Sequence, residues 1–242
     1  LVVFTSDHGE MLGDFGCFGK RCMMEASVRV PLIARHPARF PAGRRCGTPV
    51  SLLDLYPTFS AATGCDAEPP DPGARPLDQL AAAPDTRRIV TSQFSQRSLG
   101  LYMATDGEWK YVHSAADRRD WLHHLTTDPH ERDDRSDDPS ARSVRDVLRG
   151  ALIDRFERDG YAFAVEDGRW RDYGTVTLPP DPRDGLLLQD PPELARGLGA
   201  LADGYARRAP ALPPDWYVAT QPSAMNAAGR LAWPDAGPPA DR

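Results

Sequence analysis

The chain has 242 residues, with 29 lysines and arginines, 35 aspartates and glutamates, and a formal net charge of -6. Since charges of both signs are interspersed, the sequence offers no basic field that would attract nucleic acid or an anionic membrane surface. No apolar run approaches the ~20 residues of a membrane-spanning helix, so we expect no transmembrane segment. These properties leave the compartment and the oligomeric state open.

The first predicted element is a strand over residues 1–4, a short apolar run that ends in small polar residues. Such a run is typical of a strand buried on both faces of a mainly parallel sheet. In these sheets ligands bind beyond the carboxyl ends of the strands, where Asp7 and His8 stand. Because the chain begins inside this strand, without a methionine or a leader, we expect a further segment upstream.

A glycine-rich loop follows the Asp7-His8 pair, with glycines at positions 9, 13, 16 and 19 and a lysine at position 20. Glycines allow a loop to turn tightly and to approach a ligand closely. Residues 28–34 then predict a second buried strand.

A helix is predicted over residues 52–64, with Ser51 or Asp54 near its start and Gly64 at its end. Pro57 fits such a helix only in its first turn. The following stretch, residues 65–84, is rich in Pro, Asp, Gly and Ala and indicates a linker or surface loop, with a subdomain boundary near position 76.

Beyond that boundary the pattern indicates antiparallel strands and one packing helix. Strands are predicted at residues 88–94, 100–105 and 108–113, and Asp106-Gly107 is a strong hairpin signal between the last two. The clearest helix runs from about Pro139 to Gly160. Its predicted apolar face comprises Val144, Val147, Leu148, Ala151, Leu152 and Phe156.

The C-terminal stretch after this helix is again rich in proline. We expect one helical segment at about residues 193–208 and disorder in the last dozen residues. The four cysteines lack metal-ligand spacing and are expected to be free thiols. The histidines at positions 113, 123, 124 and 130 are expected at the surface.

The residues Thr5-Ser6-Asp7-His8-Gly9-Glu10-Met11-Leu12-Gly13-Asp14, then Gly19-Lys20, then Ser27-Val28-Arg29-Val30-Pro31-Leu32-Ile33, form one composite motif. This motif resembles the second metal and sulfate-binding segment of the sulfatases, which belong to the alkaline phosphatase superfamily. The resemblance covers roughly residues 1–160 and is strongest in the first 65. A weaker family-like pattern continues in Trp109-Lys110-Tyr111 and in Leu125-Thr126-Thr127-Asp128-Pro129-His130-Glu131.

The resemblance implies an α/β fold with part of an alkaline-phosphatase-like mixed sheet core and a small antiparallel C-terminal subdomain. We place the core in residues 1–75, the α+β subdomain in residues 76–165, and a Pro-rich, partly disordered extension in residues 166–242.

The candidate metal ligands are Asp7, with carboxylate oxygens, and His8, with a ring nitrogen. The alternative is an aspartate that caps the loop and a histidine held by a hydrogen bond. The resemblance favours metal ligation and gives Lys20 the role of sulfate contact, since an ammonium can neutralise a non-bridging ester oxygen. The alternative for Lys20 is a solvated loop lysine.

The metal implied by the resemblance is calcium, although calcium prefers oxygen ligands and an imidazole also suits manganese or zinc. Sulfatases also use a formylglycine made from a Cys-x-Pro-x-Arg or Cys-x-Ala-x-Arg signature, and this chain contains neither. Cys17-Phe18-Gly19-Lys20-Arg21 shares only the cysteine and arginine spacing. We therefore expect the formylglycine upstream and expect this chain alone to be inactive.

The predicted function is that of a sulfuric ester hydrolase acting on a small-molecule sulfate ester, with half of its metal and sulfate site in this chain. One alternative is a phosphonate monoester or phosphodiester hydrolase of the same superfamily. The other is a noncatalytic binding protein in which the nucleophile is absent.

Overall fold

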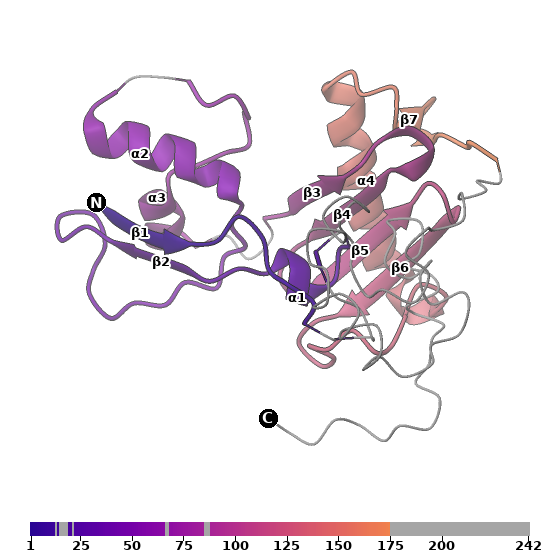
Figure 1. The fold of residues 1–242 in the computed structure, drawn as a ribbon, viewed down its shortest axis with the longest axis horizontal. Coiled ribbons are helices and arrows are strands. Elements are labelled where there is room, and N and C mark those ends of the chain that lie inside the picture. Colours follow the sequence, from indigo (N-terminus) through magenta and orange to yellow (C-terminus); the bar gives the residue numbers. More distant parts are fainter. Residues whose placement is uncertain (13, 15–18, 21, 66–67, 85–87, 175–242) are drawn as a thin grey trace, which may run out of the picture.

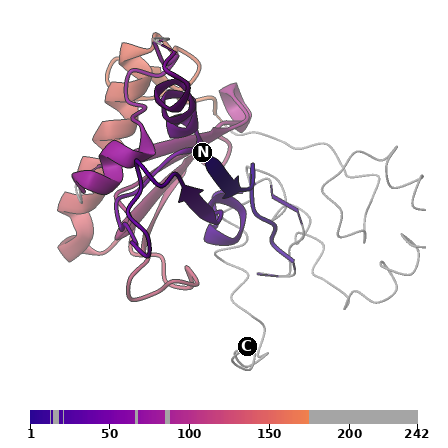
Figure 2. The same cartoon turned by 90° about the vertical axis from the view of Figure 1, so that its left-hand side faces the viewer.

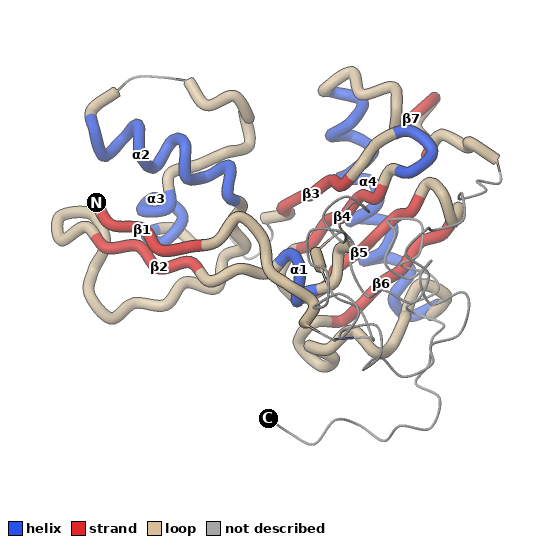
Figure 3. Tube along the Cα trace, viewed as in Figure 1, coloured by secondary structure: helices blue, strands red, loops and turns tan. Residues whose placement is uncertain are grey.

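A computed structural model describes the fold of residues 1–12, 14, 19–20, 22–65, 68–84 and 88–174. The described residues form two lobes (Figure 1), one with β1, β2, α2 and α3, the other with β3 to β8 and α4. Helix α1 lies where the lobes meet (Figure 3). The helix expected at residues 193–208, and nearly all of the Pro-rich extension, lie outside the described residues.

The first lobe contains a two-stranded sheet of β1 (Val2–Thr5) and β2 (Leu32–Arg35). The strands pair antiparallel, with Phe4 opposite Ile33, so the expectation that β1 belongs to a parallel ladder is wrong within the described residues. The expectation that β1 is buried on both faces is also wrong, because Val2 and Phe4 are 63% and 61% exposed. One apolar face of this sheet is therefore uncovered in the described structure.

The predicted strand at residues 28–34 is shorter than expected, since its start belongs to helix α1 (Glu25–Val28). The backbone amides of Ser27 and Val28 both donate to the carbonyl of Met24, at 2.8 and 3.0 Å. This single turn places the buried Ser27 next to the glycine-rich loop.

The helix predicted at residues 52–64 is confirmed as a 3-10 turn (Leu52–Asp54) that continues into α2 (Leu55–Thr63). Ser51 caps it in a capping box, and Gly64 ends it in the left-handed conformation at φ 71°. Pro57 lies in the first turn of α2, as expected.

The expected loop at residues 65–84 contains a helix that the sequence reading missed, α3 (Leu77–Ala82). Leu77 and Leu80 are buried, and the Leu77 amide donates to the Thr58 hydroxyl of α2 at 2.9 Å. The prediction was wrong here because two buried leucines stabilise a short helix within a polar composition.

The second lobe is built on a four-stranded antiparallel sheet in the order β3-β4-β5-β6. The three predicted strands are confirmed, and the sheet gains an unpredicted fourth. In the Asp106-Gly107 turn, the Asp106 carboxylate accepts from the Trp109 amide at 2.7 Å and Gly107 has φ 89°. The bounds are β3 (Val90–Phe94), β4 (Leu101–Thr105), β5 (Trp109–Ser114) and β6 (Arg119–His124).

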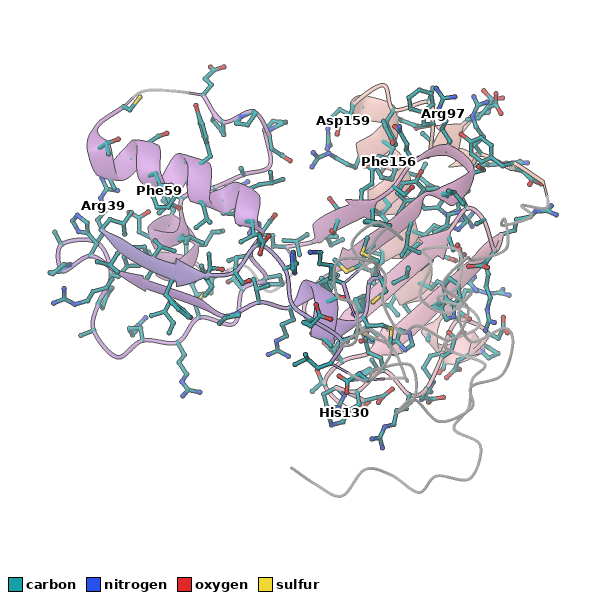
Figure 4. The ribbon with its side chains drawn as sticks, viewed as in Figure 1. Arg39, Phe59, Arg97, His130, Phe156 and Asp159 are labelled. Atoms are coloured by element: carbon teal, nitrogen blue, oxygen red, sulfur yellow. The ribbon has the colours of Figure 1, made fainter. Side chains whose placement is uncertain are left out.

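The predicted C-terminal helix is confirmed as a 3-10 turn (Pro139–Ala141) followed by α4 (Arg142–Arg158). Helix α4 covers one face of the four-stranded sheet (Figure 2). Phe156 (Figure 4) meets the Tyr102 ring edge-to-face at 5.0 Å between centroids. Val147, predicted on the packed face, is 58% exposed, so that assignment was wrong.

A small hairpin of β7 (Val165–Glu166) and β8 (Arg169–Trp170) follows α4 in the second lobe. Trp170 stacks on His113 at 4.3 Å and donates to the Tyr111 hydroxyl at 2.9 Å. His113 is therefore buried, as is His123, and the expectation of surface positions for these two was wrong.

Helix α4 contains a glycine whose replacement should stabilise the fold. Nothing lies within 4 Å of a Cβ built on Gly150, and alanine loses less conformational freedom in a helix than glycine. We expect Gly150→Ala to raise the free energy of unfolding by about 0.5–1 kcal/mol. Urea unfolding of the intact protein and its variant would measure this, and a destabilised variant would contradict it.

The expectation of free cysteines is confirmed for three of the four, and Cys17 lies outside the described residues. Cys22, Cys46 and Cys65 are free thiols. None of the helices in the described part of the chain is both long enough and apolar enough to span a bilayer.

Candidate metal and anion site

Asp7 and His8 lie directly after β1, where the chain leaves the two-stranded sheet for the glycine-rich loop. Their side chains converge, because His8 Nε2 is 3.4 Å from Asp7 Oδ2. Adjacent residues on an extended strand would point apart, so the turn after β1 is what brings the two donor atoms together.

The other ring nitrogen of His8 fixes the orientation of the imidazole. Nδ1 lies 2.7 Å from the carbonyl oxygen of Gly9. Because a carbonyl can only accept a hydrogen bond, Nδ1 is the nitrogen that carries a proton, and in the corresponding neutral tautomer Nε2 holds the lone pair. A histidine that ligates a metal commonly has this arrangement, with its second nitrogen held by a carbonyl.

The Asp7 carboxylate is oriented by the local backbone and by Ser6. Its Oδ1 accepts from the His8 amide at 3.1 Å and from the Ser6 hydroxyl at 3.3 Å, while Oδ2 faces His8. Desolvation opposes ionisation, but the nearby His8 ring, these backbone bonds and Ser6 together lower the pKa of Asp7. The side chain is 84% exposed, and its lowered pKa keeps it ionised as a cation ligand must be.

Gly9 explains why the turn has this shape. Its amide donates to the carbonyl of Ser27 at 2.8 Å, and a Cβ added to it would lie 1.9 Å from the Ala26 carbonyl oxygen. Only a glycine therefore fits between His8 and helix α1. The sequence shows a glycine here, but the close approach to α1 becomes evident only in the structure.

Lys20 stands at the end of the glycine-rich loop and is exposed. Hydrogen bonds join the two ends of the loop. The Met11 amide donates to the Gly19 carbonyl at 2.8 Å, and the Glu10 carboxylate accepts from the Gly19 amide. The loop thereby returns Lys20 to the segment that follows Asp7 and His8, although 13 positions separate Lys20 from Asp7 in the sequence.

A single carboxylate and a single imidazole cannot by themselves complete a coordination shell. No third His, Cys, Asp or Glu joins them in a metal-binding group within the parts of the chain that the structure describes. Within the described residues, this pair of donors is therefore incomplete as a cation site.

Comparison with known proteins identifies the family. The family model "N-sulphoglucosamine sulphohydrolase, C-terminal" matches residues 13–158. Choline-sulfatase of Rhizobium meliloti is 32% identical over 178 residues, which cover 71% of this chain and 34% of that protein. Arylsulfatase K of Mus musculus is 34% identical over 143 residues, which cover 54% of this chain and 26% of that protein.

Among solved structures, the phosphonate monoester hydrolase of Agrobacterium radiobacter matches with a TM-score of 0.55 and 26% identity. The match covers 65% of this chain and 35% of that one. The chain thus spans between a quarter and about a third of the length of these relatives. The α/β fold class expected from the sequence is confirmed. Since the family model covers more than half of its residues, the chain belongs to the sulfatase family of the alkaline phosphatase superfamily.

Proposed function

We propose that the intact protein containing this chain hydrolyses a small-molecule sulfate ester, with Asp7 and His8 as two ligands of a divalent cation and Lys20 as a sulfate contact. The observation that best supports this is the convergence of Asp7 Oδ2 and His8 Nε2, 3.4 Å apart. The bond from His8 Nδ1 to the Gly9 carbonyl frees Nε2 for a metal.

In this proposal the bound cation supplies Lewis-acid polarisation of the ester. Asp7 and His8 hold their donor atoms in a fixed orientation, so little reorganisation is needed when the site fills. Lys20 neutralises a non-bridging oxygen of the sulfate, where negative charge is concentrated. The nucleophile is a formylglycine from outside this chain, because the chain has no cysteine in the required signature.

For the metal we propose Ca²⁺, with Mn²⁺ and Zn²⁺ as alternatives because of the imidazole donor. The test strips the intact protein with a chelator and restores each ion separately, with aryl sulfate turnover as the readout. Restoration by Ca²⁺ at the lowest concentration supports the proposal. Restoration by Mn²⁺ or Zn²⁺ alone would identify that ion as the metal instead of Ca²⁺. Full activity after stripping would refute the metal role.

A second candidate is phosphonate monoester or phosphodiester hydrolysis, which the resemblance to the Agrobacterium radiobacter enzyme favours. Comparison of kcat/KM on an aryl sulfate, an aryl phosphonate monoester and an aryl phosphate diester separates the two. We expect the sulfate to be preferred by at least tenfold, and a preference for either phosphorus ester would reverse the assignment.

A noncatalytic role requires that the intact protein lack the nucleophile. Sequencing the gene upstream of Leu1 tests this directly. A Cys-x-Pro-x-Arg or Cys-x-Ala-x-Arg segment supports the enzyme, whereas its absence supports a binding protein.

The 242-residue chain by itself is expected to show no sulfatase turnover. It lacks the formylglycine signature and, in its described part, a complete metal-ligand group. The measurement is aryl sulfate hydrolysis by the purified chain with added Ca²⁺, beside the intact protein as positive control. Turnover by the chain alone would show that its own residues supply the nucleophile.

A further inference from the structure

A buried ion cluster joins the four-stranded sheet to helix α1. Lys110 is fully buried on β5, and its Nζ lies 3.0 Å from Glu25 Oε1 and also pairs with Glu131. The second Glu131 oxygen accepts from the Glu25 backbone amide at 2.6 Å. Glu131 therefore holds both the side chain of Lys110 and the first residue of α1.

The cluster lies on the face of the sheet opposite to α4. Tyr111 packs in the core under α4, and neighbouring residues of a strand point to opposite faces, so Lys110 points away from α4. The residues of the cluster are far apart in sequence, with 85 positions between Glu25 and Lys110 and 106 between Glu25 and Glu131. Figure 1 shows α1 beside β5, at the junction of the lobes.

Helix α1 in turn holds the turn that carries the candidate ligands. The carbonyl of Ser27 accepts from the Gly9 amide, and the carbonyl of Ala26 leaves no room for a Cβ on Gly9. The Gly9 carbonyl then holds His8 Nδ1 at 2.7 Å. A continuous series of contacts therefore connects Lys110, through Glu25 and α1, to His8.

The chemical nature of the cluster indicates a role in geometry. Burying an ammonium and two carboxylates costs desolvation free energy that apolar side chains of similar volume would avoid. Glu131 also adopts a left-handed backbone conformation at φ 54°, which is uncommon for a non-glycine residue. A different placement of α1 relative to the sheet would leave a buried charge without its partner, which is strongly destabilising.

We propose that Lys110 is a positioning residue, which acts with Glu131 and Glu25 to hold α1 against the sheet and thereby to set the Asp7-His8 turn for the cation. The inference rests on the proposed function for its catalytic consequence, but its structural consequence can be measured independently.

The experiment compares the intact protein with Lys110→Met and Glu131→Gln. Glu131→Gln keeps one oxygen acceptor for the Glu25 amide, but it removes the charge and replaces the oxygen that faces Lys110 with an NH2 group. The matched control is Asp134→Asn, which removes a partly buried carboxylate from the same lobe. Asp134 bonds Arg119 and the amides of Leu122 and Ser136.

We expect Lys110→Met to speed amide hydrogen exchange by at least tenfold in peptides spanning residues 7–12 and 22–28. The exchange rates of β4 and β5 should stay unchanged. Turnover of aryl sulfate should fall at least tenfold at a temperature where urea unfolding shows the variant to be fully folded, and excess Ca²⁺ should restore part of it. A loss of turnover in fully folded protein distinguishes a displaced turn from a weakened fold. Glu131→Gln should show the same changes at smaller size. If Lys110→Met does not accumulate as folded protein, Glu25→Gln takes its place.

Unchanged exchange around Gly9, or equal acceleration in Asp134→Asn, would overturn the positioning role. Should the unmodified intact protein hydrolyse none of the esters, the proposed function fails, while the exchange measurement still decides whether the cluster holds the turn.

Discussion

Replacement of Gly9 by alanine is expected to destabilise the intact protein by about 3 kcal/mol or more and to abolish most of its ester hydrolysis. The added methyl group would lie 1.9 Å from the backbone carbonyl oxygen of Ala26. A backbone atom cannot rotate aside as a flexible side chain can, so either α1 or the turn must move. Movement of the turn breaks the 2.8 Å bond to Ser27 and displaces His8.

The measurements are urea unfolding and kcat/KM on an aryl sulfate, with Gly47→Ala as the control. Nothing lies within 4 Å of a Cβ built on Gly47, and its φ is outside the left-handed region. We expect the control to change stability by less than about 0.5 kcal/mol. Equal behaviour of the two variants would mean that the close approach of α1 to Gly9 does not exist in solution.

Replacement of Asp7 by alanine is expected to lower kcat/KM on the order of 10³-fold, because Lewis-acid stabilisation by a metal contributes several kcal/mol and each 1.36 kcal/mol is tenfold in rate. The effect on stability should stay below about 1 kcal/mol, since the side chain is 84% exposed. Steady-state kinetics, urea unfolding and calcium titration of the intact protein together test this separation of activity from stability.

Asp146→Ala serves as the control for loss of an exposed carboxylate, because Asp146 lies on α4 and pairs with Arg145. We expect its kcat/KM to stay within twofold of the unmodified protein. If Asp7→Ala retained full activity and full calcium affinity, Asp7 would be a loop-capping residue, which is the alternative its hydrogen bonds to Ser6 and His8 allow.

The predictions that succeeded rest on local chemistry. Asp106-Gly107 specifies its turn through contacts within four residues, and the capping pair Ser51 and Asp54 acts across one turn of chain. Gly64 marks a helix end because it adopts positive φ without steric cost. Such signals depend on neighbours in sequence, so the sequence alone is sufficient to read them.

The predictions that failed depend on distant packing. The apolar run of β1 could not reveal that it pairs antiparallel with β2 or that Phe4 is exposed. His113 was expected at the surface, but Trp170 stacks on it from a hairpin 57 positions further along the chain. Short apolar runs and lone histidines take their burial from partners that a sequence pattern does not identify.

The candidate site was likewise predictable only in part from the sequence. The motif was sufficient to select Asp7, His8 and Lys20, and their roles remain predictions to be tested. The motif did not reveal why Gly9 is needed or that Lys110, in a separate family-like segment, connects to the turn through α1. Both features arise from contacts between segments that are remote in sequence.

The uncovered face of the two-stranded sheet has a practical consequence for handling the chain. Val2, Phe4 and Ile33 form an exposed apolar patch, and Ile33 itself is 64% exposed. Sheets with an exposed apolar face and unpaired edges readily associate with strands of other molecules. When the 242-residue chain is prepared separately, sedimentation should therefore reveal concentration-dependent clustering, and replacing Phe4 with lysine should reduce it by introducing charge repulsion between copies.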